Sequence, residues 1–303
     1  MEEKFEPCGV LAIDKPQGMT SHDVVGKVRR LYHTRKVGHT GTLDPMATGV
    51  LVILVGRAAK AAEYLSVHNK AYTAVMRLGL TTDTEDVTGQ TLTTSAGTPA
   101  PEDVLKAAKS FEGEILQTPP MYSALKVNGQ KLVDLARRGI EVERVARPVT
   151  VHSLSCRHLQ ESDYELQVSC SAGTYIRTLC ADIGKALGCG GVMAALRRTE
   201  TGSFALADCV TPEQLEQMTD AERLSLLRPT ESLFDELPAV HLPSFYEKLC
   251  RNGCEIYQKK INTDHKIGTR VRLCDASGAF FALGEVREYE NGTAIKGIKY
   301  FDV

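Results

Sequence analysis

The sequence lacks a long apolar run and the usual marks of a secreted chain. Its longest apolar stretch, residues 50–55, is far shorter than the roughly 18 residues that cross a bilayer. Residues 1–6 are acidic and polar, without the cationic start and apolar core of a secretion signal. These features predict a cytoplasmic protein that makes no contact with a membrane.

Paired motifs for disulfides and metals are lacking as well. The nine cysteines are odd in number and scattered, and the closest pair, Cys250 and Cys254, has no matching second pair at zinc-ligand spacing. We therefore expect reduced cysteines, most of them small buried residues, and no metal site.

Several widespread catalytic motifs are missing. The chain has no G-x-x-x-x-G-K-[ST], no strand-linked G-x-G-x-x-G, no H-E-x-x-H and no G-x-S-x-G. This argues against an NTPase, a dinucleotide-dependent enzyme and a serine hydrolase.

What is present is an ordinary globular composition with an uneven charge distribution. The chain has 303 residues, 43% apolar and 24% charged, enough for one large domain or for one large and one small domain. The net charge is −2, yet ten basic residues oppose four acidic ones over residues 10–80. Such segregation permits a basic face for phosphate groups, although helices with solvated charges explain it equally well.

Local patterns predict helices and strands that are intermixed along the chain. We expect strands at residues 9–13, 50–55, 72–78 and 164–170, and helices that start at Ser21, Pro101, Thr174 and Thr211. Residues 35–49 show neither the 3.6-residue apolar period of a helix nor the two-residue period of a strand, and they predict a long ordered loop. An acidic, proline-marked stretch at residues 227–243 precedes a β-rich segment. The mixture favours an α+β fold over a doubly wound parallel sheet.

The loop before residue 50 carries the strongest candidate for chemistry. Asp44 stands among glycine, threonine and alanine, and Pro45 fixes the turn after it. A loop aspartate is more often an Asx-turn or a helix cap. If Asp44 is catalytic, the lack of a second carboxylate or metal ligand nearby favours a nucleophile over a glycosidase pair.

Five segments in order resemble the TruB family of tRNA pseudouridine synthases. They are G-V-L-A-I-D-K-P at 9–16, G-T-L-D-P-M-A-T-G at 41–49, K-A-Y at 70–72, P-P-M-Y-S-A-L-K at 119–126 and G-T-Y-I-R-T-L at 173–179. The resemblance is nearly continuous from about residue 8 to 205. Each motif alone is weak, but five in the right order are specific.

The resemblance implies the pseudouridine-synthase fold, a mixed and mostly antiparallel sheet with flanking helices. It implies a catalytic domain at 1–235 with an RNA-gripping thumb at about 117–147, and a β-rich PUA-like RNA-binding domain at 238–303. The implied reaction converts uridine 55 in the T-loop of tRNA to pseudouridine after base flipping. It requires no cofactor, nucleotide or guide RNA, and the C-terminal domain is expected to reach the acceptor stem.

The resemblance also assigns the catalytic residues. Asp44 would be the nucleophile, and whether it attacks the ribose or the uracil ring, or assists elimination, is left open. Arg177 would pair with Asp44 and favour its ionised form, because a nearby cation lowers the pKa of a carboxylate. Tyr72 would stack on the flipped uracil and take part in proton transfer. A core tyrosine is an alternative for Tyr72, and a surface charge for Arg177.

Further positions are expected to bind the RNA. Tyr175 and Leu196 would line the base pocket, and His39 would fill the space that the flipped base leaves. Asp86 belongs to an acidic turn in which Thr88 replaces a second acid of the family pattern. The expected phosphate contacts are basic: Lys15, Lys60, Arg137, Arg138, Arg197 and Arg198. Core packing or solvated charge is the alternative for each.

Two rival hypotheses compete with a stand-alone tRNA enzyme. One is a guide-RNA-dependent relative that acts on ribosomal RNA, which the bacterial type of thumb and the lack of a long basic tail disfavour. The other is an RNA chaperone with little or no catalysis, which the intact set of Asp44, Tyr72 and Arg177 disfavours.

Overall fold

A computed structural model describes residues 6–65, 69–95, 97 and 99–301. It has the predicted α+β fold, built on a nine-stranded sheet in the order β1-β3-β12-β4-β11-β10-β7, with β2 beside β3 and β13 beside β12. The strands of this sheet are β1 (Gly9–Lys15), β2 (Val37–His39), β3 (Thr48–Val55), β4 (Lys70–Leu78), β7 (Gly113–Gln117), β10 (Arg147–Gln160), β11 (Asp163–Cys170), β12 (Gly191–Thr201) and β13 (Phe204–Ala205).

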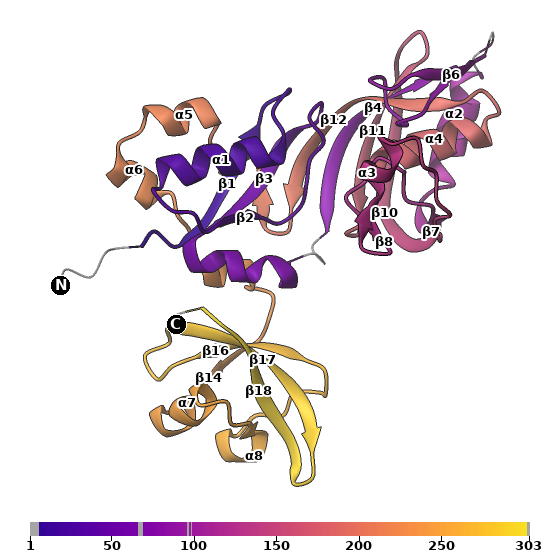
Figure 1. The fold of residues 1–303 in the computed structure, drawn as a ribbon. Helices are drawn as coiled ribbons and strands as arrows, with labels where there is room; N and C mark the ends of the chain where they lie inside the picture. The colour runs from indigo at the N-terminus through magenta and orange to yellow at the C-terminus, as the bar shows by residue number, and fades with distance from the viewer. Residues whose placement is uncertain (1–5, 66–68, 96, 98, 302–303) are drawn as a thin grey trace.

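The large sheet consists of two halves that meet next to the predicted catalytic loop (Figure 1). β12 pairs with β4 along most of its length, but with β3 only through Arg197↔Thr48 and Arg198↔Gly49, which is the one parallel pairing between two named strands of this sheet in the described chain. Gly49 has φ +102°, and a Cβ there would collide with the Arg198 carbonyl. Glycine at the end of the loop is therefore required for the two halves to join.

Helices cover the sheet, and some helices of the chain begin at a capping box. α1 (Ser21–Leu31) lies on the first half and buries Val24, Val25 and Val28, whereas α4 (Ile176–Ala186) and α2 (Pro101–Lys109) lie on the second. The N-cap of α1 is Thr20, one residue before the expected Ser21, and it forms a capping box with Asp23. The predicted start at Thr211 is correct, because its side chain caps α5 (Pro212–Gln217).

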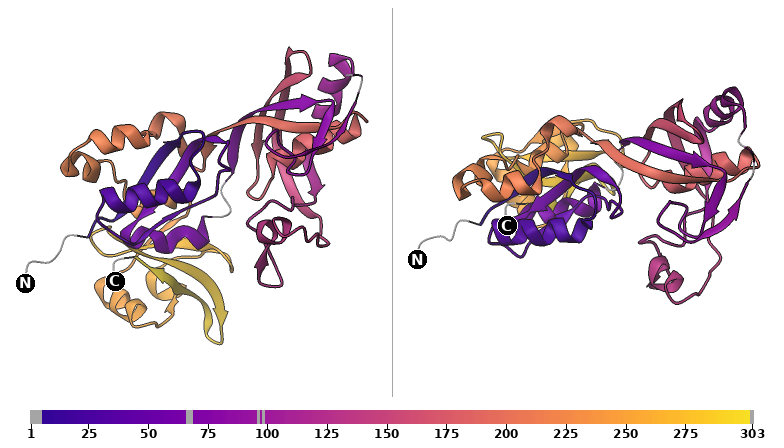
Figure 2. Two further views of the ribbon diagram at one scale, coloured as in Figure 1. Left: turned by 45° about the horizontal axis from the view of Figure 1, so that its top comes forward. Right: turned by 90° about the horizontal axis from the view of Figure 1, so that it is seen from above.

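The segment expected to act as a thumb leaves the sheet between β7 and β10. Gln117 and Arg147 are register partners at its root, so residues 117–147 begin and end side by side. The segment holds the short hairpin β8 (Lys126–Val127) and β9 (Gln130–Lys131), followed by α3 (Leu132–Ala136). Figure 2 shows it projecting away from the sheet.

The β-rich C-terminal module is a five-stranded sheet in the order β14-β16-β17-β18-β15. Its elements are β14 (Ala239–His241), α7 (Ser244–Arg251), β15 (Ile256–Tyr257), α8 (Gln258–Ile261), β16 (Arg270–Cys274), β17 (Phe280–Tyr289) and β18 (Gly292–Tyr300). It packs beside η1 (Gly56–Tyr64), and Leu283 and Phe301 share a hydrophobic cluster with Val10, Leu54 and Phe234. The division near residue 235 stays a prediction, since this packing crosses it.

The structure departs from the sequence-based prediction in the loop at 35–49 and in two long strands. Residues 37–39 form β2 against β3, so part of the expected loop belongs to the sheet. β10 and β12 were not predicted, although they join the thumb and the two halves of the sheet. No described helix combines the length and apolar character needed to span a membrane.

Candidate active site

Asp44 and Arg177 form an ion pair where the two halves of the sheet meet. Arg177 lies in the first turn of α4, and its Nε stands 3.0 Å from Asp44 Oδ2. The Arg177 side chain is only 6% exposed, whereas that of Asp44 is 37% exposed. The arginine therefore lies on the buried side of the carboxylate, and Asp44 stays accessible to a substrate.

The ionisation of Asp44 reflects opposing influences. Burial raises its pKa, the guanidinium of Arg177 lowers it, the carboxylate of Asp86 raises it, and Lys15 lowers it. Arg177 thus lowers the pKa of Asp44, in the direction expected of a nearby cation, but burial outweighs it and the net shift is upward. Arg177 limits a rise that burial causes.

Every edge of the Arg177 guanidinium has a partner. Nη1 donates to the Thr84 carbonyl at 3.0 Å and Nη2 to the Tyr122 carbonyl at 2.8 Å, while Asp86 Oδ2 lies 3.9 Å from Nη1. A guanidinium group held at Nε, Nη1 and Nη2 cannot rotate freely. The thumb segment, which carries Tyr122, thus takes part in orienting the arginine.

Asp86 supports this arrangement and does not face a ligand. It is 5% exposed, and its Oδ1 accepts hydrogen bonds from the hydroxyls of Thr84 and Thr88 and from the Thr88 backbone N–H. Oδ1 is thus occupied within the turn and Oδ2 lies near the guanidinium of Arg177, and this placement argues against the expected role of Asp86 in substrate binding. Thr88, where the sequence departs from the family pattern, supplies two of these bonds.

Buried polar side chains fix the loop that carries Asp44. Lys15 is 0% exposed, and its ammonium donates to the carbonyls of Met19 at 2.7 Å, Pro16 at 3.0 Å and Pro45 at 3.3 Å. Burial lowers the pKa of Lys15 to about 8. The predicted phosphate contact is therefore corrected, because the ammonium of Lys15 has no access to RNA.

A second buried cation holds the start of the loop. Arg198 is 1% exposed, and it donates from Nε to the Val50 carbonyl at 2.7 Å and from Nη2 to the Gly41 carbonyl at 3.1 Å. It is thus not a phosphate contact either. Its neighbour Arg197 forms a half-exposed pair with Asp14, at 2.7 Å.

Ser21 was predicted to cap α1, but in the structure its side chain bonds to the loop that carries Asp44. Its hydroxyl accepts from the Leu43 N–H at 2.9 Å and donates to the Leu43 carbonyl at 3.1 Å, which fixes the residue before Asp44. A serine at a helix start is so common as a cap that the sequence carries no signal for this second use.

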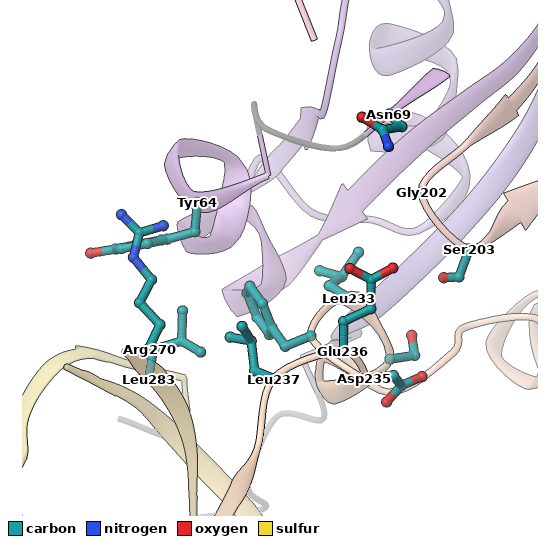
Figure 3. Close-up of a pocket in the computed structure, with 12 residues that line it drawn as sticks. Tyr64, Asn69, Gly202, Ser203, Leu233, Asp235, Glu236, Leu237, Arg270 and Leu283 are labelled. Carbon is teal, nitrogen blue, oxygen red and sulfur yellow. The ribbon is translucent and has the colours of Figure 1, made fainter. Parts of the chain in front are cut away.

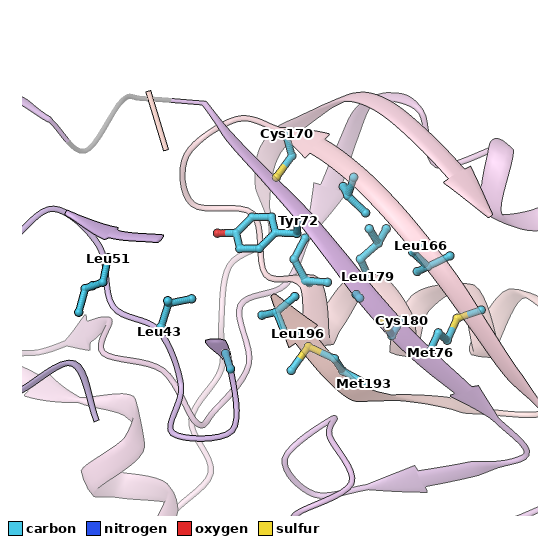
Figure 4. Close-up of a cluster of buried hydrophobic side chains, with 14 of the residues drawn as sticks. Leu43, Leu51, Tyr72, Met76, Leu166, Cys170, Leu179, Cys180, Met193 and Leu196 are labelled. Atoms are coloured by element: carbon cyan, nitrogen blue, oxygen red, sulfur yellow. The ribbon is translucent and has the colours of Figure 1, made fainter. Parts of the chain in front are cut away.

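The expected wall of a base pocket lies on neighbouring strands. Tyr72 on β4 and Leu196 on β12 are each 8% exposed, and both belong to the main hydrophobic core. Figure 4 shows the Tyr72 ring extending from β4 with its hydroxyl on the side of Leu43, and Leu196 below it. Burial raises the pKa of Tyr72 and of Tyr175, the N-cap residue of α4.

His39 and Lys60, two further residues expected to bind RNA, lie on β2 and η1. His39 ends β2, accepts from the Gly41 N–H through Nδ1 at 3.3 Å, and meets the His22 ring edge-on at 5.9 Å. Burial lowers the pKa of His39, which favours a neutral ring. Lys60 on η1 is exposed, and its ammonium donates to the Tyr300 carbonyl of the C-terminal module at 3.2 Å.

A cavity of about 370 Å³ lies elsewhere, between the large sheet and the C-terminal module (Figure 3). Tyr64, Asn69, Asp235, Glu236 and Arg270 are among the residues that line it. It contains none of the predicted site residues. Within the described parts of the chain, no three His, Cys, Asp or Glu side chains gather in a way that could hold a metal.

Comparison with known proteins points to one family. Residues 29–176 match the model for the TruB family pseudouridylate synthase N-terminal domain, and residues 177–235 match that for the tRNA pseudouridylate synthase B C-terminal domain. The chain is 47% identical to tRNA pseudouridine synthase B of Clostridium kluyveri, over 93% of this chain and 96% of that protein. It is 40% identical to the protein of the same name from Haemophilus influenzae (strain Rd), over 95% and 92%.

Solved structures share the fold over the whole length. A Cbf5-Nop10-Gar1 complex matches with a TM-score of 0.75 and 27% identity, covering 97% of this chain and 84% of that chain. An H/ACA RNP bound to a substrate RNA containing 2′-deoxyuridine matches with a TM-score of 0.73 and 25% identity, covering 97% and 85%.

Proposed function

The chain belongs to the TruB family of pseudouridylate synthases, and from this premise we propose that it converts uridine 55 in the T-loop of tRNA to pseudouridine with Asp44 as nucleophile. The observation that carries the proposal is the pair of Asp44 and Arg177, in which the carboxylate is the accessible partner and the guanidinium is fixed behind it.

The reaction rearranges bonds without adding or removing atoms overall. The bond from ribose C1′ to uracil N1 breaks, a bond from C1′ to C5 forms, and N1 gains a proton while C5 loses one. No electron is transferred and no group is donated, so the proposal includes no cofactor. Asp44 supplies the nucleophile, which forms a bond to one of the two fragments while the base turns; that bond breaks again before the product leaves, so the carboxylate is regenerated.

Tyr72 suits two roles in this scheme. Its ring lies in the wall formed with Leu196, where an aromatic face can stack on an extruded uracil. Burial raises the pKa of its hydroxyl, so the group stays protonated and can donate or relay a proton at neutral pH. Tyr175 would close the pocket from the start of α4.

The RNA would be held by surfaces on both sides of Asp44. Arg137 and Arg138 are exposed on the thumb segment, where phosphate contacts would position the T-stem-loop. A neutral His39 would stack in the gap that the flipped base leaves, which offsets part of the cost of flipping. The C-terminal module, through the surface near Lys60, would add a contact to the acceptor stem.

Two observations favour a tRNA substrate without a guide RNA. Relatives named tRNA pseudouridine synthase B are 40% and 47% identical to this chain over more than nine-tenths of its length. The matching chains of the multi-component assemblies, the H/ACA RNP and the Cbf5-Nop10-Gar1 complex, are more distant, at 25% and 27% identity. We therefore propose that the chain acts alone.

The test uses purified full-length protein and an unmodified tRNA transcript, with a chelator present and no guide RNA. Pseudouridine is mapped along the transcript, and release of tritium from uracil C5 gives the rate. A transcript with cytidine at position 55 serves as the control. Modification at another position, a requirement for a guide, or no product would each contradict the proposal.

A further inference from the structure

The last residue of β7, Gln117, is buried at the root of the thumb segment. It is 2% exposed and is the register partner of Arg147, so it lies where both ends of residues 117–147 leave the sheet. Buried glutamine is uncommon and needs hydrogen-bond partners. Its partners are in another element.

The side-chain amide of Gln117 forms two hydrogen bonds with the backbone of one residue. Tyr175 N–H donates to Oε1 at 2.7 Å, and Nε2 donates to the Tyr175 carbonyl at 3.0 Å. The amide of Gln117 thus bonds to the N–H and the C=O of Tyr175 as the backbone of a neighbouring β-strand would. Tyr175 is the N-cap of α4 and makes no side-chain cap of its own, so Gln117 satisfies the N–H of the residue on which the helix starts.

The backbone position at the start of α4 determines where two of the proposed active-site residues lie. Tyr175 is expected to line the base pocket, and Arg177 follows two residues later with its Nε 3.0 Å from Asp44. The thumb also contacts the arginine itself, because Nη2 of Arg177 donates to the Tyr122 carbonyl. The root of the thumb and the catalytic pair are therefore connected through α4 at two places.

We infer that Gln117 is a positioning residue, which holds Tyr175 and Arg177 in register with the thumb so that Asp44 meets the flipped nucleotide correctly. The inference rests on the proposed function and names a residue through which that site is organised. Gln117 touches neither Asp44 nor, in this scheme, the RNA. Its loss should thus slow the chemical step and leave RNA binding nearly unchanged.

The first experiment replaces the amide by an apolar side chain of similar length. Gln117→Met leaves the partly buried Tyr175 N–H without this acceptor, and leaves the Tyr175 carbonyl with the Leu179 N–H but without the amide of Gln117, so the start of α4 should shift. Small displacements of catalytic groups are costly, and we expect the single-turnover rate on a T-stem-loop hairpin to fall by about tenfold or more. The hairpin Kd should change by less than about threefold, since phosphate contacts dominate it.

The matched control is Gln167→Met, the same change at an exposed strand position on β11. Its rate and affinity should equal those of the unaltered protein. The unaltered protein in the same assay tests the proposed function separately, because failure of that protein to modify the hairpin would overturn the function and not only the role of Gln117.

The second experiment uses Gln117→Glu and the pH. A protonated glutamic acid retains one donor and one acceptor for Tyr175, whereas a carboxylate opposes the Tyr175 carbonyl. The charged groups around Tyr175 are Arg177, Arg147 and Asp44. The cations favour the ionised form and burial disfavours it. The rate relative to the unaltered protein should be highest at low pH and should fall as the pH rises.

These measurements separate positioning from a loss of folding. A merely structural role would lower the folded fraction and leave the rate of the folded protein unchanged, with a rate ratio for Gln117→Glu that does not vary with pH. That result, or a Gln117→Met protein with an unaltered single-turnover rate, would overturn the inference. If Gln117→Met does not fold, the pH series of Gln117→Glu decides alone.

Discussion

Around Asp44 the chain is held by buried cations, whereas the joint with the C-terminal module is held by aromatic rings. Lys15, Arg177 and Arg198 are each at most 6% exposed, and all three donate to backbone carbonyls. At the joint, the rings of Phe280 and Phe301 lie 5.3 Å apart and those of Phe234 and Phe301 lie 5.8 Å apart.

The difference reflects what each region has to achieve. A buried cation is costly unless its donors are used, so it fixes the orientation of every group around it. Burial of aromatic rings stabilises contact but specifies orientation less strictly. Directional bonds therefore surround the residues proposed to react, whereas aromatic packing, with a few polar contacts such as that of Lys60 with the Tyr300 carbonyl, attaches a module whose proposed role is to extend the RNA-binding surface.

The most severe way to break the catalytic region is Asp44→Asn. Because the amide cannot act as a nucleophile, turnover should fall by about four orders of magnitude or more, as when a catalytic nucleophile is removed. Binding of tRNA should persist, since one charge contributes little to a phosphate-dominated interface. Single-turnover formation of pseudouridine and a binding titration measure the two effects. Asp103→Asn, at an exposed position on α2, is the control.

Arg177→Lys tests whether orientation matters beyond charge. Lysine keeps the cation but cannot reach Asp44, the Thr84 carbonyl and the Tyr122 carbonyl together, so the rate of the chemical step should fall by about a hundredfold. Arg157→Lys on β10 provides the same change at a side chain that is 69% exposed, and should be neutral. Weaker tRNA binding with an unchanged single-turnover rate would contradict the positioning of Asp44 by Arg177.

The aromatic joint should respond in stability and not in chemistry. Phe301→Ala removes a ring that is 5% exposed and packs on Phe234 and Phe280, which should lower the free energy of unfolding by about 3–5 kcal/mol. Denaturant unfolding measures this effect, and Phe245→Ala, at a ring that is 66% exposed, is the control. Equal effects of the two changes would mean that the joint contributes little, and a slower single-turnover rate would mean that the regions are not separable.

Local signals in the sequence predicted the elements that have strong local causes. The strand at 164–170 alternates buried and exposed residues, and the helix after Thr211 has a capping box; both are present in the structure. β10, with 14 residues, was missed because most of its positions are exposed and it lacks an apolar period. β12 was missed although Leu196, Arg197 and Arg198 had been singled out, since strand pairing is a non-local property.

The same limit explains the errors in the predicted site. Asp44 and Arg177 were identified by resemblance, and their ion pair could be expected from the chemistry of the side chains. Lys15 and Arg198 were assigned to phosphates because lysine and arginine are rarely buried. Only the tertiary structure gives each a set of carbonyl acceptors in the interior. Gln117 carried no signal at all, since its partner is 58 residues away in the sequence.

The smallest expected effect concerns Lys15 and depends on pH. Its pKa in the folded protein is about 8, below the ordinary value of 10.5, so between these values the unfolded chain binds more protons than the folded chain. Stability should therefore rise with pH through this window, because below pH 8 the fold has to keep a charged ammonium buried. At about 1.36 kcal/mol for each pKa unit, the gain in the free energy of unfolding is at most about 3.4 kcal/mol, and relaxation of the surroundings makes it smaller.

Comparison with Lys15→Met isolates this contribution. The free energy of unfolding of both proteins is measured at pH 7 and at pH 10. Other groups also titrate near pH 10, but they are common to both proteins. Their effects therefore cancel in the difference between the two free energies. The unaltered protein should gain stability relative to Lys15→Met over that interval, and Lys106→Met, at an exposed position on α2, should show no such trend. A difference that stays constant with pH would mean that Lys15 titrates normally, and that the loop around Asp44 does not depend on a desolvated ammonium.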